Sequence, residues 1–118
     1  MKHTELVVWQ KSIELVELVY RVSRKFPSDE RFGLCTQIQR SSVSVPANIA
    51  EGHGRKSTKA YRNHLSIAHG SLMELETHIT IARRLGYIAE NEATDLLSMT
   101  GEIGRMLNGL QNSLSPDT

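Results

Sequence analysis

Four cations gather within eight residues near the middle of the chain, at a spacing that could contact phosphate groups. They are Arg55, Lys56, Lys59 and Arg62. Ser57 or Thr58, between them, is a good residue to cap the start of a helix, and a helix N-terminus carries partial positive charge that favours anions. Such a cluster suits the phosphate backbone of a nucleic acid. For a monomer, a solvated surface that only keeps the protein in solution is an equally good interpretation.

A second group of cations is predicted at the opposite pole if the chain forms an antiparallel helix bundle. This group consists of Arg21, Arg24, Lys25, Arg31, Arg83 and Arg84. Residues 19–62 carry nine Lys/Arg against three acidic residues, a net +6, although the whole chain carries only +1. Clustered charge of one sign indicates a directed electrostatic face. A ring-shaped oligomer would repeat each patch, which favours RNA or DNA as a partner. With only Tyr61 nearby, backbone contacts are expected rather than base stacking.

Polar side chains also recur along one face of the segment from residue 37 to residue 55. The set comprises Gln37, Arg40, Ser44, Asn48 and Glu51, at steps of three, four, four and three residues. The opposite stripe is apolar, and small residues beside the polar line would let another helix approach closely. We expect a buried or interfacial hydrogen-bond network that fixes one packing register, because unsatisfied members are costly. The alternative is a plain solvent-exposed face.

No group of residues indicates catalysis or metal binding. His64, His69 and His78 are five and nine residues apart, so they do not share a face as zinc ligands would. Solvated or partner-facing histidines are expected instead. The acids before His78 lie four and two residues away, which is not the Glu-x-x-His spacing of di-iron bundles. Cys35 is expected to be an inert buried thiol. We therefore expect no enzymatic activity, no metal and no cofactor.

Apolar periodicity predicts four helices, over about residues 5–25, 29–52, 58–86 and 90–114. The third has the cleanest pattern, with Tyr61, Leu65, Ala68, Leu72, Leu75, Ile79 and Ala82 spaced alternately by four and three. Phe26-Pro27 ends the first helix, since the residue before a proline is disfavoured in the α region. Long helices with short connections predict an all-α, antiparallel up-down-up-down four-helix bundle, as one domain over residues 1–118. The tail from Ser115 to Thr118 is expected to fray.

The first two helices determine which surfaces are left for partners. The first carries two adjacent apolar stripes, Trp9, Ile13, Val16 and Tyr20 beside Leu15, Val19, Val22 and Phe26. Both stripes could be buried in the bundle, or the second could pack on another subunit. The second helix is expected to begin at the cap Ser28 and to bury Phe32, Leu34, Cys35, Ile38, Val45 and Ile49.

Composition indicates a cytoplasmic protein. The single cysteine rules out an internal disulfide and fits a reducing compartment. No apolar run approaches the ~20 residues needed to span a bilayer. The first five residues lead directly into an amphipathic pattern and contain no signal-peptide core.

The polar segment carries a resemblance to a known family. Its run Gln37…Arg40…Ser44-Val-Pro46-Ala-Asn48-Ile-Ala-Glu51-Gly52…Gly54-Arg55 resembles the signature of the 23S rRNA intervening-sequence proteins, which are four-helix bundles. Further matching pieces are Trp9, Phe26-Pro27 with Glu30 and Leu34, Gly70-Ser71 with Glu74 and Glu76, and Leu85 to Ile88. The family is similar to the accessory variability determinant of diversity-generating retroelements, a basic pentameric ring that binds nucleic acid and a reverse transcriptase.

The resemblance implies a homo-oligomer, with a homopentamer as the expected state. It implies RNA or DNA as a partner, bound through the basic poles. The alternative is a protein-interaction scaffold without nucleic-acid binding, in which the polar face of the second helix holds subunits or another protein together. No membrane partner is expected.

Overall fold

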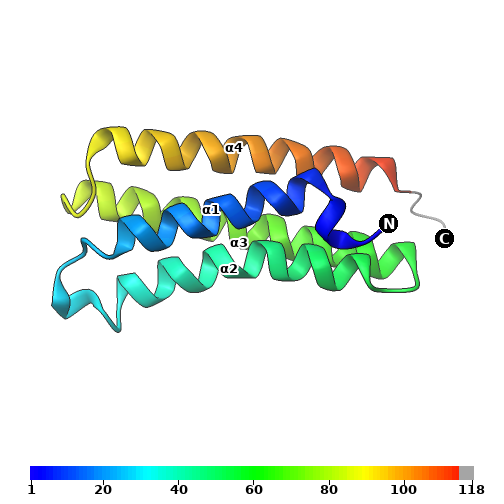
Figure 1. Ribbon diagram of the computed structural model, residues 1–118, viewed down its shortest axis with the longest axis horizontal. Coiled ribbons are helices and arrows are strands. Elements are labelled where there is room, and N and C mark those ends of the chain that lie inside the picture. Colours follow the sequence, from blue (N-terminus) through cyan, green and yellow to red (C-terminus); the bar gives the residue numbers. More distant parts are fainter. Residues whose placement is uncertain (115–118) are drawn as a thin grey trace.

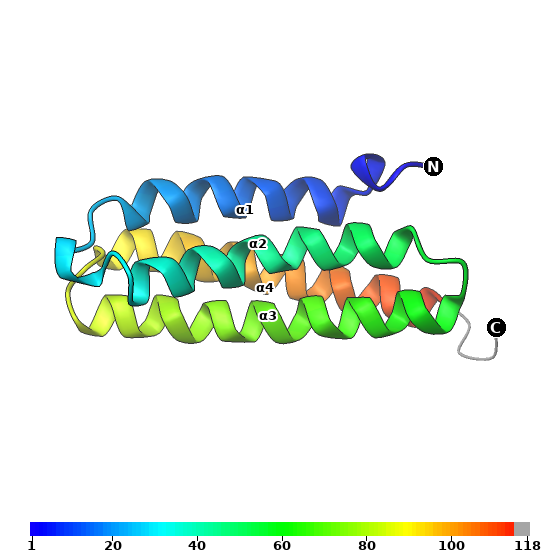
Figure 2. The ribbon, with the colours of Figure 1, turned by 90° about the horizontal axis from the view of Figure 1, so that it is seen from below.

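The computed structural model describes residues 1–114 and contains four long helices in that range (Figure 1). They are α1 (Val7–Ser23), α2 (Leu34–His53), α3 (Thr58–Arg84) and α4 (Glu90–Ser113), with two short 3-10 helices, η1 (His3–Glu5) and η2 (Ser28–Glu30). Each long helix packs antiparallel against the next, and α1 also packs against α4 (Figures 1 and 2). The predicted all-α up-down-up-down bundle is confirmed. The expected fraying of residues 115–118 lies outside the described residues.

The core is built from aliphatic side chains contributed by all four long helices. The largest fully buried residues include Leu15, Ile38, Ile49, Leu65, Leu72, Leu75, Ile79, Leu96, Ile103 and Leu107. Each such side chain contributes about 1.5–3 kcal/mol when it is removed from water. The most extensive contact is between α2 and α3, so this helix pair positions the polar segment described below.

The two apolar stripes of α1 have different environments. Leu15, Val19, Val22 and Phe26 are all buried in the core. The alternative that this stripe packs on another subunit is therefore wrong. In the other stripe Tyr20 remains exposed, while Ile13 and Val16 are only half-buried. That stripe, not the predicted one, is the apolar surface that α1 leaves available.

The start of α2 differs from the sequence-based expectation. Residues 28–30 form a 3-10 turn, and α2 begins at Leu34 rather than at residue 29. The reason lies in two hydrogen bonds of Glu30: one carboxylate oxygen accepts from the Leu34 amide (3.3 Å), and the other accepts from the Tyr87 hydroxyl (2.9 Å), 57 residues later in the chain. This arrangement places Phe32 in a turn outside the core face. Phe32 is 87% exposed, not buried as expected, and Cys35 is only half-buried.

The remaining helix ends follow the expected local signals. Of the two candidate caps of α3, Ser57 is the one used, since its hydroxyl accepts a hydrogen bond from the Ala60 amide (3.0 Å). Gly86 follows α3 in a left-handed conformation with φ of 77°, which glycine adopts at little cost. Within residues 1–114, no helix is both long enough and apolar enough to cross a membrane.

Glycine at position 52 is required by the close approach of α3. A Cβ added at Gly52 would lie 2.7 Å from the Cβ of His64, whereas one added at Gly101 would meet only the Arg105 guanidinium at 3.5 Å. We expect Gly52→Ala to lower the free energy of unfolding by about 1–3 kcal/mol, because the backbones must separate. The matched change Gly101→Ala should raise it by about 0.5–1 kcal/mol through helix propensity. Urea unfolding of both variants would measure this difference, and equal shifts would contradict the packing explanation.

Candidate nucleic-acid interface

The cations predicted to bind phosphate at the α2–α3 turn are partly engaged within the protein. Arg55 forms an ion pair with Glu51 at 2.8 Å, one helical turn before it. Arg62 donates hydrogen bonds from α3 to the carbonyl oxygens of Gln111 and, at 3.1 Å, Leu114. It thereby caps the C-terminal end of α4, where the helix dipole favours a cation. Two of the four predicted cations therefore have internal partners.

Lys56 and Lys59 are the remaining cations at this turn. Both side chains are exposed, and neither makes an ion pair or a hydrogen bond with another residue in the range 1–114. They lie where α3 begins, at the end of the bundle opposite the η2 turn (Figure 1). The charge that this pole offers to a partner is accordingly smaller than the sequence cluster suggests.

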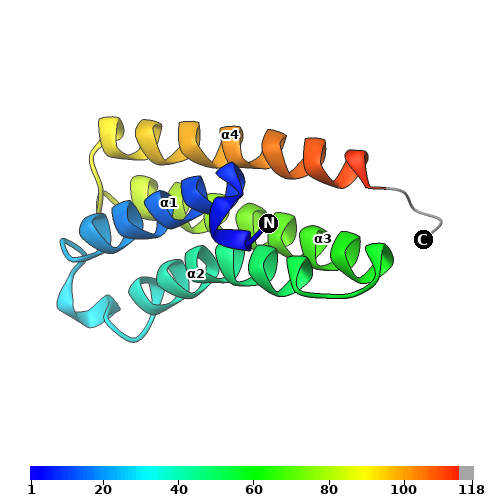
Figure 3. The same ribbon diagram turned by 45° about the vertical axis from the view of Figure 1, so that its right-hand side comes forward.

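Aromatic rings line the same end of the molecule. The rings of Trp9, His3, His53 and Tyr61 follow one another with centroid separations of 5.2, 6.5 and 5.8 Å, each pair in an edge-to-face arrangement. Burial raises the pKa of the Tyr61 hydroxyl. The sequence placed only Tyr61 near the basic turn. His53 directly precedes that turn in the sequence, whereas His3 and Trp9 are brought to it only by the packing of η1 and α1 against α2 (Figure 3).

The second predicted group of cations lies at the opposite pole, where α1 and α3 end and α2 and α4 begin (Figure 2). Lys25 pairs with Glu92 of α4, and that bond, together with the amide of Ala89, holds the pKa of the Glu92 carboxyl below its usual value. Arg24 and Arg31 line a groove of about 320 Å³ between the end of α1 and the start of α2. The others, Arg21, Arg83 and Arg84, make no ion pair with a residue in the described range.

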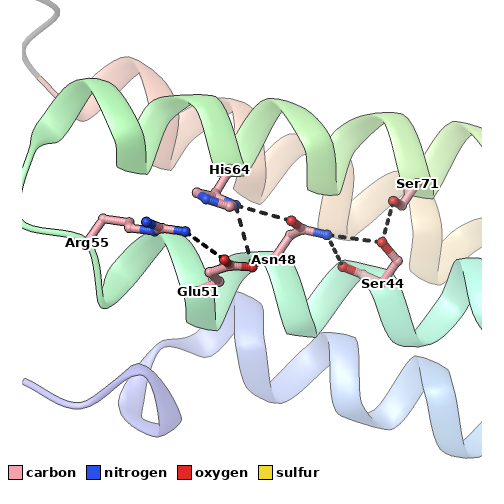
Figure 4. A network of polar contacts seen from close by, with 6 residues as sticks. All are labelled: Ser44, Asn48, Glu51, Arg55, His64 and Ser71. Atoms are coloured by element: carbon pink, nitrogen blue, oxygen red, sulfur yellow. Dashed lines mark hydrogen bonds and ion pairs between the residues drawn. The ribbon is translucent and has the colours of Figure 1, made fainter.

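The polar segment of α2 forms a chain of hydrogen bonds with α3 (Figure 4). The Ser44 and Ser71 hydroxyls lie 2.7 Å apart, and the Asn48 amide donates to the Ser44 carbonyl at 2.9 Å and hydroxyl at 3.0 Å. The Asn48 side-chain oxygen then faces Nδ1 of His64 at 3.2 Å, which requires that nitrogen to carry the proton. A Glu51 oxygen lies 4.0 Å from the same nitrogen. The chain therefore joins both helices without leaving a buried side-chain polar atom unpaired in residues 1–114.

The structure brings together only part of the predicted network. Ser44, Asn48 and Glu51 take part, but the side chains of Gln37 and Arg40 are exposed and make no hydrogen bond with another residue of the described range. Gln37 and Arg40 therefore belong to the exposed surface of α2 rather than to its polar contact with α3.

The expectation of solvated or partner-facing histidines is wrong for His64 and His78, which face Asn48 and Ser41 of α2 in the same chain. His64 is half-buried, and His78 is only 7% exposed, with its Nδ1 lying 3.1 Å from the Ser41 hydroxyl. Position 71 lies midway between these histidines, at seven-residue intervals that keep one helix face turned toward α2. This seven-residue spacing is visible in the sequence and marks one face of α3. No group of His, Cys, Asp or Glu in residues 1–114 is arranged to hold a metal ion.

Removal of the Asn48 side chain tests the polar chain between α2 and α3. We expect Asn48→Ala to lower the free energy of unfolding by about 1–3 kcal/mol, because the half-buried His64 loses its acceptor. Asn63→Ala, which truncates an exposed asparagine one residue before His64, should change stability by less than about 0.5 kcal/mol. Chemical denaturation of both variants provides the measurement. A loss of similar size in the control would contradict a specific role for Asn48.

Comparison with known proteins places this architecture among its relatives. Residues 4–109 match the family model described as 23S rRNA-intervening sequence protein. One similar solved structure is a protein of unknown function from the S23 ribosomal protein family of Bacteroides thetaiotaomicron, with 26% sequence identity and a TM-score of 0.82. The alignment covers 95% of this chain and 100% of that chain. No curated protein matches the chain.

Proposed function

The chain belongs to the 23S rRNA-intervening sequence protein family, and from this premise we propose that it binds RNA or DNA through the basic poles of the bundle. We also propose that the protein acts in the cytoplasm as an accessory factor and has no enzymatic activity. The observation that carries the proposal is the clustering of cations at both ends of the molecule, several of them without an internal partner in the described range. Family membership itself confirms the resemblance drawn from the segment 37–55.

The geometry of the bundle limits how a single chain could bind. Its longest extent is 47 Å, several times the roughly 8 Å over which salt screens charges at physiological ionic strength. The two poles therefore act independently, and each supplies only a few phosphate contacts. Binding by one chain is expected to be weak and strongly salt-dependent. A homo-oligomer would repeat each pole and raise the affinity without any new contact type.

Salt titration of RNA binding tests the proposal. We expect the protein to bind a labelled RNA at low salt, with the logarithm of the binding constant falling linearly as the logarithm of salt rises. The double change Arg21→Ala and Arg24→Ala should weaken binding and reduce the slope by about two, because each removes roughly one phosphate contact. Arg105→Ala removes an exposed arginine of α4 outside both clusters and should leave the slope unchanged.

Two results would overturn the proposal. One is the absence of RNA and DNA binding at low salt. The other is an affinity that does not respond to salt, because phosphate contacts necessarily release counterions.

We propose as the second candidate a protein-interaction scaffold that assembles into a homopentamer. The observation that favours it is the apolar stripe on α1 that the bundle leaves uncovered, where Ile13 and Val16 are half-buried and Tyr20 is 38% exposed. Single exposed apolar residues are ordinary on a monomer, but a contiguous stripe is typical of a contact surface. Val43 on the neighbouring helix α2 is also 41% exposed.

Light scattering tests the scaffold. We expect the purified protein to have five times the 13.2 kDa mass of one chain, and Val16→Arg to reduce this mass because a charge in an apolar interface must be desolvated. Thr94→Arg adds the same charge on the exposed face of α4 and should leave the mass unchanged. A wild-type protein with the mass of one chain would contradict the assembly, as would an identical response of the two variants.

A further inference from the structure

One exposed aromatic ring has no role within the described fold. Phe32 is 87% exposed, more than any other large hydrophobic residue in residues 1–114. It lies in the turn between η2 and α2, at the pole that carries Arg24 and Arg31. Aromatic residues rarely remain this exposed without a partner, since their rings provide large contact areas. The ring is therefore a candidate for contact with a second molecule.

Hydrogen bonds hold the backbone of the turn that carries the ring. On one side of Phe32, the Arg31 carbonyl accepts a hydrogen bond from the Thr36 hydroxyl at 2.7 Å. On the other side, the Gly33 amide donates to the Glu30 carbonyl at 3.0 Å. The Glu30 carboxylate is itself held by the Tyr87 hydroxyl at 2.9 Å. Because the backbone around the ring is already ordered, a ligand that contacts the ring loses little affinity to ordering.

Arginine side chains lie beside Phe32. The Arg31 guanidinium lies over the ring, 5.4 Å from its centroid, in a cation–π arrangement. Arg31 also lines the groove of about 320 Å³ next to this turn, together with Arg24, Ser28 and Gln39. With the guanidinium over one face, the high exposure of the ring leaves the other face to solvent. A flat aromatic partner with an attached anion fits this combination.

We propose that the Phe32 turn stacks on an unpaired base of single-stranded nucleic acid, while Arg24 and Arg31 contact the neighbouring phosphates. This inference rests on the proposed nucleic-acid binding and specifies the form of the substrate. Bases within a duplex are already stacked on one another and cannot cover the ring, whereas bases of a single strand can. A protein partner would require a continuous apolar surface around Phe32, and Arg24 and Arg31 interrupt the surface there. The expectation of backbone contacts rather than stacking was based on Tyr61 as the only aromatic residue near the basic cluster at residues 55–62, whereas Phe32 lies at the opposite pole.

The test compares single-stranded and duplex RNA by fluorescence anisotropy at low salt, with an oligouridylate of about 12 nucleotides and a duplex of about the same length. Phe32→Ala is expected to weaken single-strand binding by about 5- to 150-fold, the fold-change that corresponds to loss of one stacked base. Duplex binding should change by less than about twofold, because it depends on phosphate contacts. Phe32→Trp should retain the single-strand affinity, since tryptophan also stacks.

Leu85→Ala is the matched control. Leu85 is 55% exposed at the end of α3, on the same pole, but it has no aromatic ring. Its truncation should leave both affinities unchanged. Thermal unfolding followed by circular dichroism should be the same for the wild type and Phe32→Ala, because the ring packs against little in the fold.

The outcomes separate this inference from the proposed function. A wild-type protein that binds neither single-stranded nor duplex RNA at low salt, and binds no DNA either, overturns both. A wild-type protein that binds, together with a Phe32→Ala variant of equal single-strand affinity, overturns only the stacking site. A Phe32→Ala variant with a lower mass in light scattering and unchanged RNA affinity also overturns it, because the ring would then contact another protein chain.

Discussion

The close contact between α2 and α3 is the constraint on which the rest of the structure depends. Gly52 lets the two backbones approach, since an added Cβ there would lie 2.7 Å from the His64 Cβ and 3.3 Å from the Tyr61 carbonyl oxygen. At this distance polar side chains from both helices are removed from water and must find partners within the interface. The Ser44–Ser71, Asn48–His64 and Ser41–His78 contacts satisfy them. Because these bonds exist in only one register, the interface selects a single alignment of the two helices.

The contacts at the poles show how the bundle uses its charges. Lys25 is bonded to Glu92 of α4, Arg55 to Glu51, and Arg62 to the end of α4. These cations connect helices or stabilise helix ends, so a charge count overstates what a partner can contact. Exposed arginines with few internal bonds gather instead beside the η2 turn. The cations available to a partner therefore lie mainly at the opposite end of the molecule. They do not lie mainly at the α2–α3 turn, where the cluster in the sequence is densest.

The number, order and antiparallel packing of the helices followed from the sequence because apolar periodicity over 20 or so residues is a strong signal. The α3 positions from Leu65 to Ala82 show this directly, since all of that stripe is buried. The start of α2 could not be predicted in the same way. Its position depends on Glu30, whose carboxylate is engaged by Tyr87, a residue 57 positions later in the chain. Local capping preferences at Ser28 could not reveal that long-range bond, and Phe32 was consequently assigned to the core.

The candidate site, like the fold, could be predicted from the sequence only in part. Ser44 and Asn48 were identified from their spacing, but the spacing within α2 could not identify their partners on α3, Ser71 and His64. Gln37 and Arg40 share the polar line of α2 and are nevertheless exposed, because the spacing along one helix does not show which of its residues meet a partner on α3. The aromatic chain from Trp9 to Tyr61 combines segments far apart in sequence, so only the fold could bring it into view.

The Arg62 contact with α4 has a consequence for the dynamics of the chain end. Gln111 returns the interaction, with its side-chain amide donating to the Arg62 carbonyl at 2.9 Å and to the Ser66 hydroxyl at 2.7 Å. These reciprocal hydrogen bonds hold the first turns of α3 against the last turns of α4, where a helix would otherwise fray. An anion that bound the Arg62 guanidinium would break the hydrogen bonds from Arg62 to α4. Binding of an anion to Arg62 would then be coupled to local unfolding of the last turn of α4. Part of the binding free energy would be lost in this unfolding, whereas binding to the exposed Lys56 and Lys59 would not have this cost.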